Sequence, residues 1–188
     1  MESLSNFVGL FWGSFTVVAQ IISLGLIVSL FVPAVRNSAF ARFFADRAIL
    51  VGFVASLLAT AGSLVYSDVL GFAPCKFCWF QRIFMYPQVL LMGIALWRKD
   101  VGMKLYGFLL STIGAAIALY HYSGQFGIAP LPCSAVGQSV SCSERFVTQF
   151  GYITIPLMAF SAFLMMALSF WISMRKDRAA KAAASAQN

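Results

Sequence analysis

The chain has 188 residues, of which 61% are hydrophobic and 10% charged, whereas soluble domains are roughly 45–50% apolar and about 25% charged. A soluble fold of this length could not cover so much apolar surface, and disordered chains are far less hydrophobic. The composition excludes both classes and predicts an all-α membrane protein, in which the net charge of +7 indicates orientation in the bilayer and no nucleic-acid partner.

Uncharged stretches of the sequence predict five transmembrane helices. A helix needs about 20 apolar residues to cross the hydrocarbon core of a bilayer, and four uncharged runs reach that length without adjustment. A fifth run, residues 83–97, reaches it when the helix is extended back through Cys78. The predicted helices cover approximately residues 10–32, 48–67, 78–98, 105–122 and 150–173.

The first of these helices is expected to be retained. A secretory signal peptide has a positively charged start and an apolar region of about 7–15 residues, whereas this N-terminus carries Glu2 and a much longer apolar run. Gly9 and Gly13 have the small-x-x-x-small spacing of closely packed helices, which by itself is a weak signal. At the other end, the small, polar tail after Lys181 is expected to be frayed and solvated.

Basic residues predict how the chain is oriented. Lys and Arg are enriched in cytoplasmic loops of membrane proteins, and 10 of the 13 fall between helices one and two, between helices three and four, or after helix five. We therefore expect an external N-terminus and a cytoplasmic C-terminus. The ten residues are Arg36, Arg42, Arg47, Arg98, Lys99, Lys104, Arg175, Lys176, Arg178 and Lys181.

Four cysteines fall in the two connections that this orientation makes external. Cys75 and Cys78 form a C-x-x-C pair before the third helix, and Cys133 and Cys142 precede the fifth. The second pair suits either a structural or a redox-active disulfide in an oxidising compartment. For the first pair, a structural role is less favoured, because a disulfide across the short C-x-x-C loop would restrain the unfolded chain little. A redox role suits it better, because the start of a helix stabilises a reactive thiolate. A four-cysteine zinc site is a third interpretation, although the second pair lacks the usual ligand spacing.

Arg82 follows Cys78 by four residues and so lies on the same face of the predicted helix. Its guanidinium could stabilise a thiolate at Cys78 and hold the oxygen of an electron acceptor as that oxygen gains negative charge. Alternatively, Arg82 extends to the membrane interface without a functional role.

Residues Pro74 to Ile83, which read P-C-K-F-C-W-F-Q-R-I, resemble the block that opens a transmembrane helix in the DsbB family of membrane disulfide-bond formation proteins, closest to its BdbC-type branch. The resemblance covers about residues 48–174. Other segments that contribute to it are Met85-Tyr86-Pro87, His121-Tyr122, the loop from Cys133 to Cys142, and Gly151-Tyr152-Ile153-Thr154-Ile155-Pro156.

This resemblance implies a four-helix transmembrane bundle that carries the redox cysteines. Such a protein oxidises a thioredoxin-like partner of the DsbA or BdbD type outside the cytoplasm and passes the electrons to a membrane quinone, ubiquinone or menaquinone, with no metal. A relay of this kind keeps the bacterial periplasm oxidising, so the resemblance also implies a location in the bacterial cytoplasmic membrane, in contact with lipid.

The resemblance also implies roles for individual residues. Cys75 and Cys78 correspond to the quinone-coupled pair, with Cys78 nearest the quinone and Arg82 its polar neighbour. Cys133 and Cys142 correspond to the pair that exchanges with the partner, and Cys133 is expected to form the mixed disulfide.

Two further residues are candidates for binding the quinone. Gln81 could donate a hydrogen bond to it or instead hold a helix–helix contact. His121, near the end of the fourth helix, could lie at the depth of the quinone or be a satisfied histidine at the membrane interface.

Three segments follow from this comparison. Residues 1–47 hold an extra N-terminal helix, which the four-helix pattern does not require, and a basic cytoplasmic loop. Residues 48–174 form the redox bundle, and residues 175–188 form a basic, Ala-rich cytoplasmic tail.

Other functions remain open at this point. A thiol-reducing conduit or a relative of the vitamin K epoxide reductases would use similar cysteines, but in the latter the loop pair precedes the C-x-x-C, and here it follows. A membrane scaffold with inert structural disulfides is the non-enzymatic alternative.

Overall fold

The computed structural model describes residues 2–131 and 141–186 of the chain. Strands are absent from these residues, in which one antiparallel bridge joins Gln149 and Ile153. The elements are α1 (Glu2–Phe31), α2 (Pro33–Arg36), α3 (Ala39–Asp46), α4 (Ala48–Leu64), the π-helical turn η1 (Val65–Val69), α5 (Lys76–Arg98), α6 (Met103–Gln125) and α7 (Ile155–Ser185).

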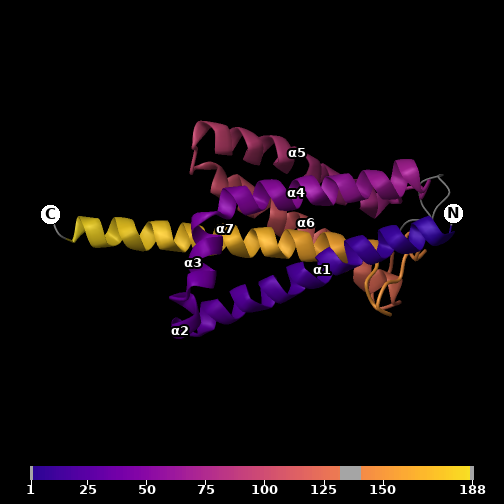
Figure 1. The fold of residues 1–188 in the computed structure, drawn as a ribbon, viewed down its shortest axis with the longest axis horizontal. Helices are drawn as coiled ribbons and strands as arrows, with labels where there is room; N and C mark the ends of the chain where they lie inside the picture. The colour runs from indigo at the N-terminus through magenta and orange to yellow at the C-terminus, as the bar shows by residue number, and fades with distance from the viewer. Residues whose placement is uncertain (1, 132–140, 187–188) are drawn as a thin grey trace.

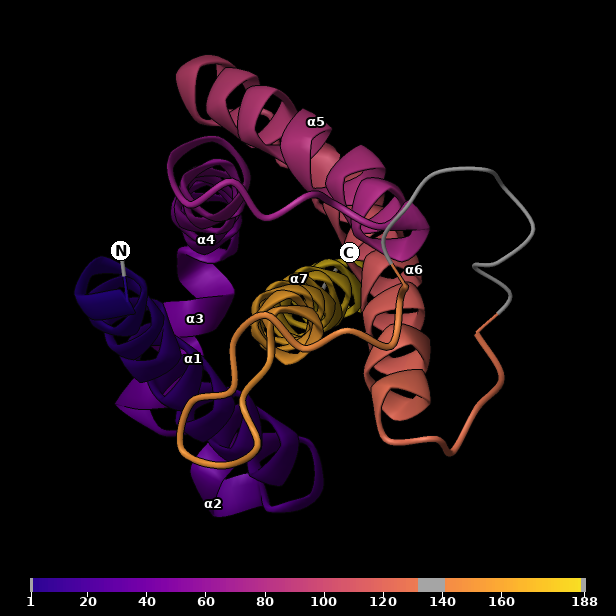
Figure 2. The same ribbon diagram turned by 90° about the vertical axis from the view of Figure 1, so that its right-hand side faces the viewer.

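The long helices α1, α4, α5, α6 and α7 extend along the long axis of the molecule, and the short helices α2 and α3 lie together on the side where the last part of α7 projects beyond the other helices (Figure 1). Seen down that axis, α7 is central and the other four long helices surround it (Figure 2). Half of the most apolar stretch of α7 is buried, against 28% in α1 and α4 and 22% in α6. The bundle is therefore organised around its last helix.

Four of the described helices are long and apolar enough to cross a membrane, at Ser3–Phe31, Ala48–Val69, Met103–Gln125 and Ile155–Ser185. This confirms the prediction of an all-α, multi-pass membrane protein. The 23-residue helix α5 is not among them because Gln81, Arg82 and Gln88 reduce its apolar character. Its crossing of the bilayer stays a prediction, based on a length of about 34 Å at 1.5 Å per residue.

Several predicted helix ends differ from the structure. α1 begins at Glu2, well before residue 10, because the requirement for membrane length does not limit a helix that continues into water. α7 begins later than predicted, since Phe150 and Gly151 have positive φ values of 51° and 78°, a conformation that helices do not contain. The tail after Lys181 is helical to Ser185 and not frayed, as its alanines favour a helix.

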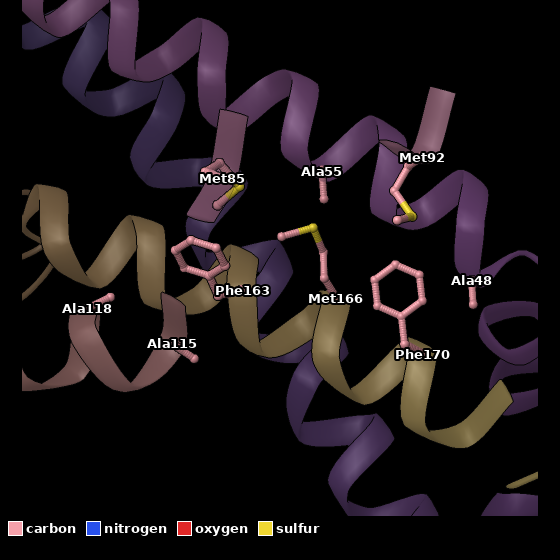
Figure 3. Packing of buried hydrophobic residues seen from close by; sticks show 9 residues of the cluster. All are labelled: Ala48, Ala55, Met85, Met92, Ala115, Ala118, Phe163, Met166 and Phe170. Carbon is pink, nitrogen blue, oxygen red and sulfur yellow. The ribbon is translucent and has the colours of Figure 1, made fainter. Parts of the chain in front are cut away.

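Phenylalanine rings of α7 fill the centre of the bundle. Phe163 and Phe170 are completely buried, with Met166 between them (Figure 3). Glycines on neighbouring helices make room for the rings: a Cβ at Gly114 of α6 would lie 2.4 Å from the Phe163 ring, and one at Gly52 of α4 would lie 2.5 Å from the Phe170 ring. These close approaches fix how α4 and α6 pack against α7.

Ion pairs join helices at one end of the bundle. At the end that holds α3, Asp46 pairs with Lys176, and Asp177 pairs with Lys104 at 2.7 Å. These ion pairs tie α3 and the start of α6 to the last part of α7. The C-x-x-C pair lies at the opposite end, where α5 and α7 begin and α6 ends.

We expect Gly114→Ala to lower the free energy of unfolding by about 1–3 kcal/mol, the usual cost of overpacking a core, although alanine is the better helix former. Thermal or denaturant unfolding in detergent micelles measures the effect. Adding Phe163→Leu should recover part of the loss, because the smaller side chain relieves the clash. A Gly114→Ala variant as stable as the unmodified protein would contradict this packing.

Candidate functional site

Cys75 and Cys78 form the start of α5. Cys75 is the N-cap residue, with an extended backbone, and its Sγ accepts a hydrogen bond from the backbone N–H of Cys78 at 3.4 Å. The two sulfur atoms are 3.1 Å apart, and both side chains are free thiols. A helix start has unpaired N–H groups and the positive end of the helix dipole, so this position stabilises a negative charge on sulfur.

His121 of α6 is buried beside Cys75, with 1% of its surface exposed. Its Nε2 lies 3.0 Å from the carbonyl oxygen of Cys142 and 3.6 Å from Sγ of Cys75. Because a carbonyl oxygen only accepts hydrogen bonds, Nε2 carries a proton, and Nδ1 forms a second hydrogen bond with the Gln81 amide at 3.0 Å. Gln81 and His121 thus link α5 to α6 and to the loop before α7.

Cys142 lies in that loop, is buried, and is disulfide-bonded. The sulfur atoms of Cys75 and Cys142 and a ring nitrogen of His121 all lie within 4.8 Å of one another. Cys133, the other cysteine of the predicted second pair, lies outside the described residues. The first pair is therefore in contact range of one member of the second.

These three side chains are of the types that bind zinc. A cysteine ligates a metal as a thiolate, and the sulfur of Cys142 is part of a disulfide in this structure. The arrangement fits thiol–disulfide chemistry better than the zinc site considered from the sequence.

The pKa of Cys75 is lowered to about 4. The largest cause is the hydrogen bond with the Cys78 thiol, to which the contacts with His121 add, while burial acts in the opposite direction. Cys75 is therefore a thiolate at neutral pH, and the thiolate is the form that attacks disulfides.

Arg82 is held against α4 by Ser63. Its Nε donates to Oγ of Ser63 at 3.0 Å, and a terminal nitrogen donates to the carbonyl oxygen of Ser63 at 3.2 Å. The Tyr86 hydroxyl donates to the same Oγ at 3.2 Å, and the guanidinium lies 5.2 Å from the centre of the Trp79 ring. These contacts give the guanidinium a defined position one helical turn from Cys78.

A pocket of about 160 Å³ lies beside Cys78. Gln81 and Arg82 line it from α5 and Ser63 lines it from α4, while most of its remaining wall is apolar and comes from α1, α4 and α7. A second, much smaller cavity, of about 20 Å³, is lined by Cys78, Cys75, His121 and Cys142, among others. Cys78 borders both spaces.

The predicted site residues that the structure describes all lie at this end of the bundle, but they line different cavities. Gln81 and Arg82 line the larger pocket, whereas His121 borders the smaller cavity and contacts the Cys75 sulfur. Two further residues were not predicted from the sequence: Ser63, which orients Arg82, and Trp12 of α1, which lines the larger pocket. Neither residue belongs to a motif, and no sequence signal marks either one.

Comparison with known proteins gives a family for most of the chain. A family model described as "Disulfide bond formation protein DsbB" matches residues 45–173. This segment begins in α3 and ends in α7, so α1 lies outside it.

Curated relatives match the same part of the chain. "Probable disulfide formation protein C" of Bacillus cereus is 41% identical over 127 residues, which cover 68% of this chain and 91% of the relative. "Disulfide bond formation protein C" of Bacillus subtilis is 42% identical over 118 residues, covering 60% and 82%. "Probable disulfide formation protein" of Metapseudomonas resinovorans is 37% identical over 131 residues, covering 68% and 90%. No solved structure matches the chain.

We expect Cys75 of the reduced protein to stay ionised from about pH 8 down to about pH 5, since its pKa is about 4, against about 8.5 for an ordinary thiol. The lowered pKa of Cys75 stabilises the reduced folded protein fully at pH values above the ordinary thiol pKa. This stabilisation is lost as the pH falls through the lowered pKa of the folded protein. Alkylation of Cys75, followed by peptide mass spectrometry, should have a nearly constant rate over this range.

His121→Ala should shift the pH midpoint of this alkylation upward, because it removes one cause of the lowered pKa. Lys76→Gln is the matched control, since Lys76 is an exposed neighbour that is not among those causes. An alkylation rate that falls tenfold per pH unit below about pH 8 would overturn the assignment of a thiolate to Cys75.

Proposed function

Because the chain belongs to the DsbB family of disulfide bond formation proteins, we propose that it is a thiol:quinone oxidoreductase that reoxidises a thioredoxin-like partner. Membership of the family makes it a protein-disulfide oxidoreductase that supports disulfide bond formation from a multi-pass membrane fold. Our proposal adds the quinone acceptor, a partner of the DsbA or BdbD type, and the roles of individual residues.

The observation that carries the proposal is the different surroundings of the two sulfur atoms of the C-x-x-C pair. Sγ of Cys75 lies within 4.8 Å of the Cys142 sulfur, whereas Cys78 borders the larger pocket. A disulfide between Cys75 and Cys78 could therefore receive electrons at one sulfur and release them from the other. Such a pair connects the loop cysteines to an acceptor in the membrane.

In the first stage of the proposed path, a partner thiolate attacks the Cys133–Cys142 disulfide. A mixed disulfide forms through Cys133, and Cys142 leaves as a thiolate. The second partner thiolate attacks the mixed disulfide, so the partner departs oxidised and both loop cysteines are reduced. Each step needs a thiolate attacker and an accessible disulfide sulfur.

In the second stage, the Cys142 thiolate attacks Sγ of Cys75 in the Cys75–Cys78 disulfide and releases the Cys78 thiolate. Cys133 then attacks the Cys75–Cys142 bond at Cys142, which restores the loop disulfide and leaves Cys75 as a thiolate. Finally, Cys75 and Cys78 rejoin as two electrons and two protons pass to the quinone. The net reaction converts the partner dithiol and a quinone into a partner disulfide and a quinol.

The chemistry of the larger pocket suits a quinone ring. When bound, a quinone supplies a two-electron acceptor whose carbonyl oxygens gain negative charge. The guanidinium of Arg82, oriented by Ser63, offers hydrogen-bond donors for such an oxygen. The apolar wall excludes water, which strengthens this interaction. Gln81 borders the pocket and positions His121, so we assign it to both tasks.

We also propose the orientation of the protein and the division of the chain into segments. The basic segments around α3, between α5 and α6, and in the last part of α7 face the cytoplasm, in keeping with the enrichment of Lys and Arg in cytoplasmic loops. The cysteines then face the outside of a bacterial cytoplasmic membrane, where disulfides persist. Residues 48–174 form the redox bundle, residues 1–47 add α1 and the basic loop, and residues 175–188 form a basic, Ala-rich cytoplasmic tail, in which α7 continues to Ser185.

Cys75→Ser and Cys78→Ser should each reduce quinone turnover by a reduced thioredoxin-like donor to background, because each removes a sulfur from the path. They should differ in a second measurement. Cys78→Ser leaves Cys75 without its close partner, so a Cys75–Cys142 disulfide should accumulate and be found by mass spectrometry after acid quenching. Cys75→Ser should not form it. Residual turnover by either variant would contradict the proposed path.

Arg82→Lys should raise the KM for quinone about tenfold, the effect of losing roughly 1.4 kcal/mol of hydrogen bonding. Lysine keeps the charge but lacks the planar group that binds Ser63. The KM for the donor protein should not change. Lys76→Arg, at an exposed position of the same helix, is the matched control, and an unchanged quinone KM in Arg82→Lys would remove Arg82 from the acceptor site.

A further inference from the structure

The N-terminal helix α1 lies outside the residues that the family model matches, yet it forms part of the pocket beside Cys78. We propose that α1 is a wall of the quinone site and that Trp12 contributes to the affinity for the quinone ring. This inference rests on the proposed quinone reduction, and it adds a specificity-determining residue from a segment that the four-helix bundle does not include.

One face of α1 contributes to the pocket. Trp12, Phe15, Thr16 and Ala19 line it, and their spacing of three and four residues puts them on a single helical face. Thr16 is buried and its hydroxyl donates to the Trp12 carbonyl at 2.9 Å, so its hydrogen-bond donor is already used within α1. The wall that α1 provides is consequently apolar and aromatic.

The Trp12 ring lies against α4 at Gly62. A Cβ at Gly62 would be 3.1 Å from two atoms of the indole ring, so the missing side chain is what lets the ring approach so closely. Ser63, the next residue of α4, and its hydrogen-bond partner Arg82 of α5 line the same pocket. An aromatic ring on one wall and a guanidinium on another suit a flat, apolar ring with carbonyl groups at its edge.

Polar contacts on a second face of α1 fix its rotation. Gln20 donates to Oγ of Ser161 at 3.3 Å and accepts from the Tyr152 hydroxyl at 3.0 Å. Near the start of α1, a Cβ at Gly9 would lie 2.4 Å from the Gln149 side chain. Because these contacts hold α1 to α7 and to the loop before it, the face that carries Trp12 is held toward the pocket.

Direct binding tests the proposal independently of turnover. A short-chain benzoquinone and a short-chain naphthoquinone are titrated into the purified, full-length protein by isothermal calorimetry. Trp12→Ala should raise the Kd for at least one ring about threefold to tenfold, the usual value of an aromatic contact. In steady-state assays the quinone KM should rise by a similar factor, with the donor KM unchanged. A photoreactive azidoquinone should label the peptide that contains Trp12.

Ile21→Ala is the matched control, because Ile21 is 66% exposed on the same helix and does not line the pocket. Gly62→Ala should weaken quinone binding without a substitution in α1, since its Cβ would lie 3.1 Å from the Trp12 indole ring and shift it. Together with Trp12→Phe, this variant keeps the proposal testable if Trp12→Ala does not fold.

The outcomes separate this inference from the proposed function. Unchanged quinone Kd values in Trp12→Ala, or in Trp12→Phe and Gly62→Ala if it does not fold, would overturn the role of α1 and leave the proposed function intact. A loss of kcat with unchanged Kd would also overturn it. An unmodified protein that neither binds nor reduces quinone would instead refute the proposed function.

Discussion

The cysteine-bearing end of the bundle depends on the sulfur atom of Cys75. This atom caps α5 by accepting the Cys78 N–H, lies 3.1 Å from the Cys78 sulfur, and contacts His121. An N-cap must accept a hydrogen bond from the first turn of its helix, and a thiolate accepts one more strongly than a neutral thiol. The charge that makes Cys75 reactive therefore also holds the start of α5, so reactivity and local structure have the same cause.

Beside this sulfur, three buried polar groups are paired in a short chain. The Gln81 amide, the His121 ring and the Cys142 carbonyl oxygen are linked by two hydrogen bonds of 3.0 Å. An unpaired polar group in an apolar interior costs several kcal/mol, so these bonds determine where the loop lies. They hold the loop through its backbone and not through the Cys142 sulfur. Thiol–disulfide exchange at Cys142 can accordingly proceed without detaching the loop from the bundle.

Much of the fold could be predicted from the sequence because crossing a bilayer is a requirement on consecutive residues, which charge spacing reveals directly. The same holds for Cys78 and Arg82, since residues four apart share a helical face. By contrast, the contact of His121 with Cys75 depends on how α6 packs against α5. The position of α6 is set in turn by close fits against α7, such as Gly114 against Phe163, which no periodicity encodes.

Helix α1 associates with the bundle through specific contacts because the general hydrophobic effect does not act between helices in lipid, where acyl chains solvate apolar side chains equally well. The contacts occur at three positions along α1. Gly9 lies beside Gln149, Gln20 hydrogen-bonds to Ser161 and Tyr152, and Gly25 lies against the Phe40 ring of α3. A helix attached in this way can add a wall to a pocket without changing the helices that carry the cysteines. In the proposed path, α1 would then contribute to the affinity for the acceptor, whereas the cysteines lie on other parts of the chain.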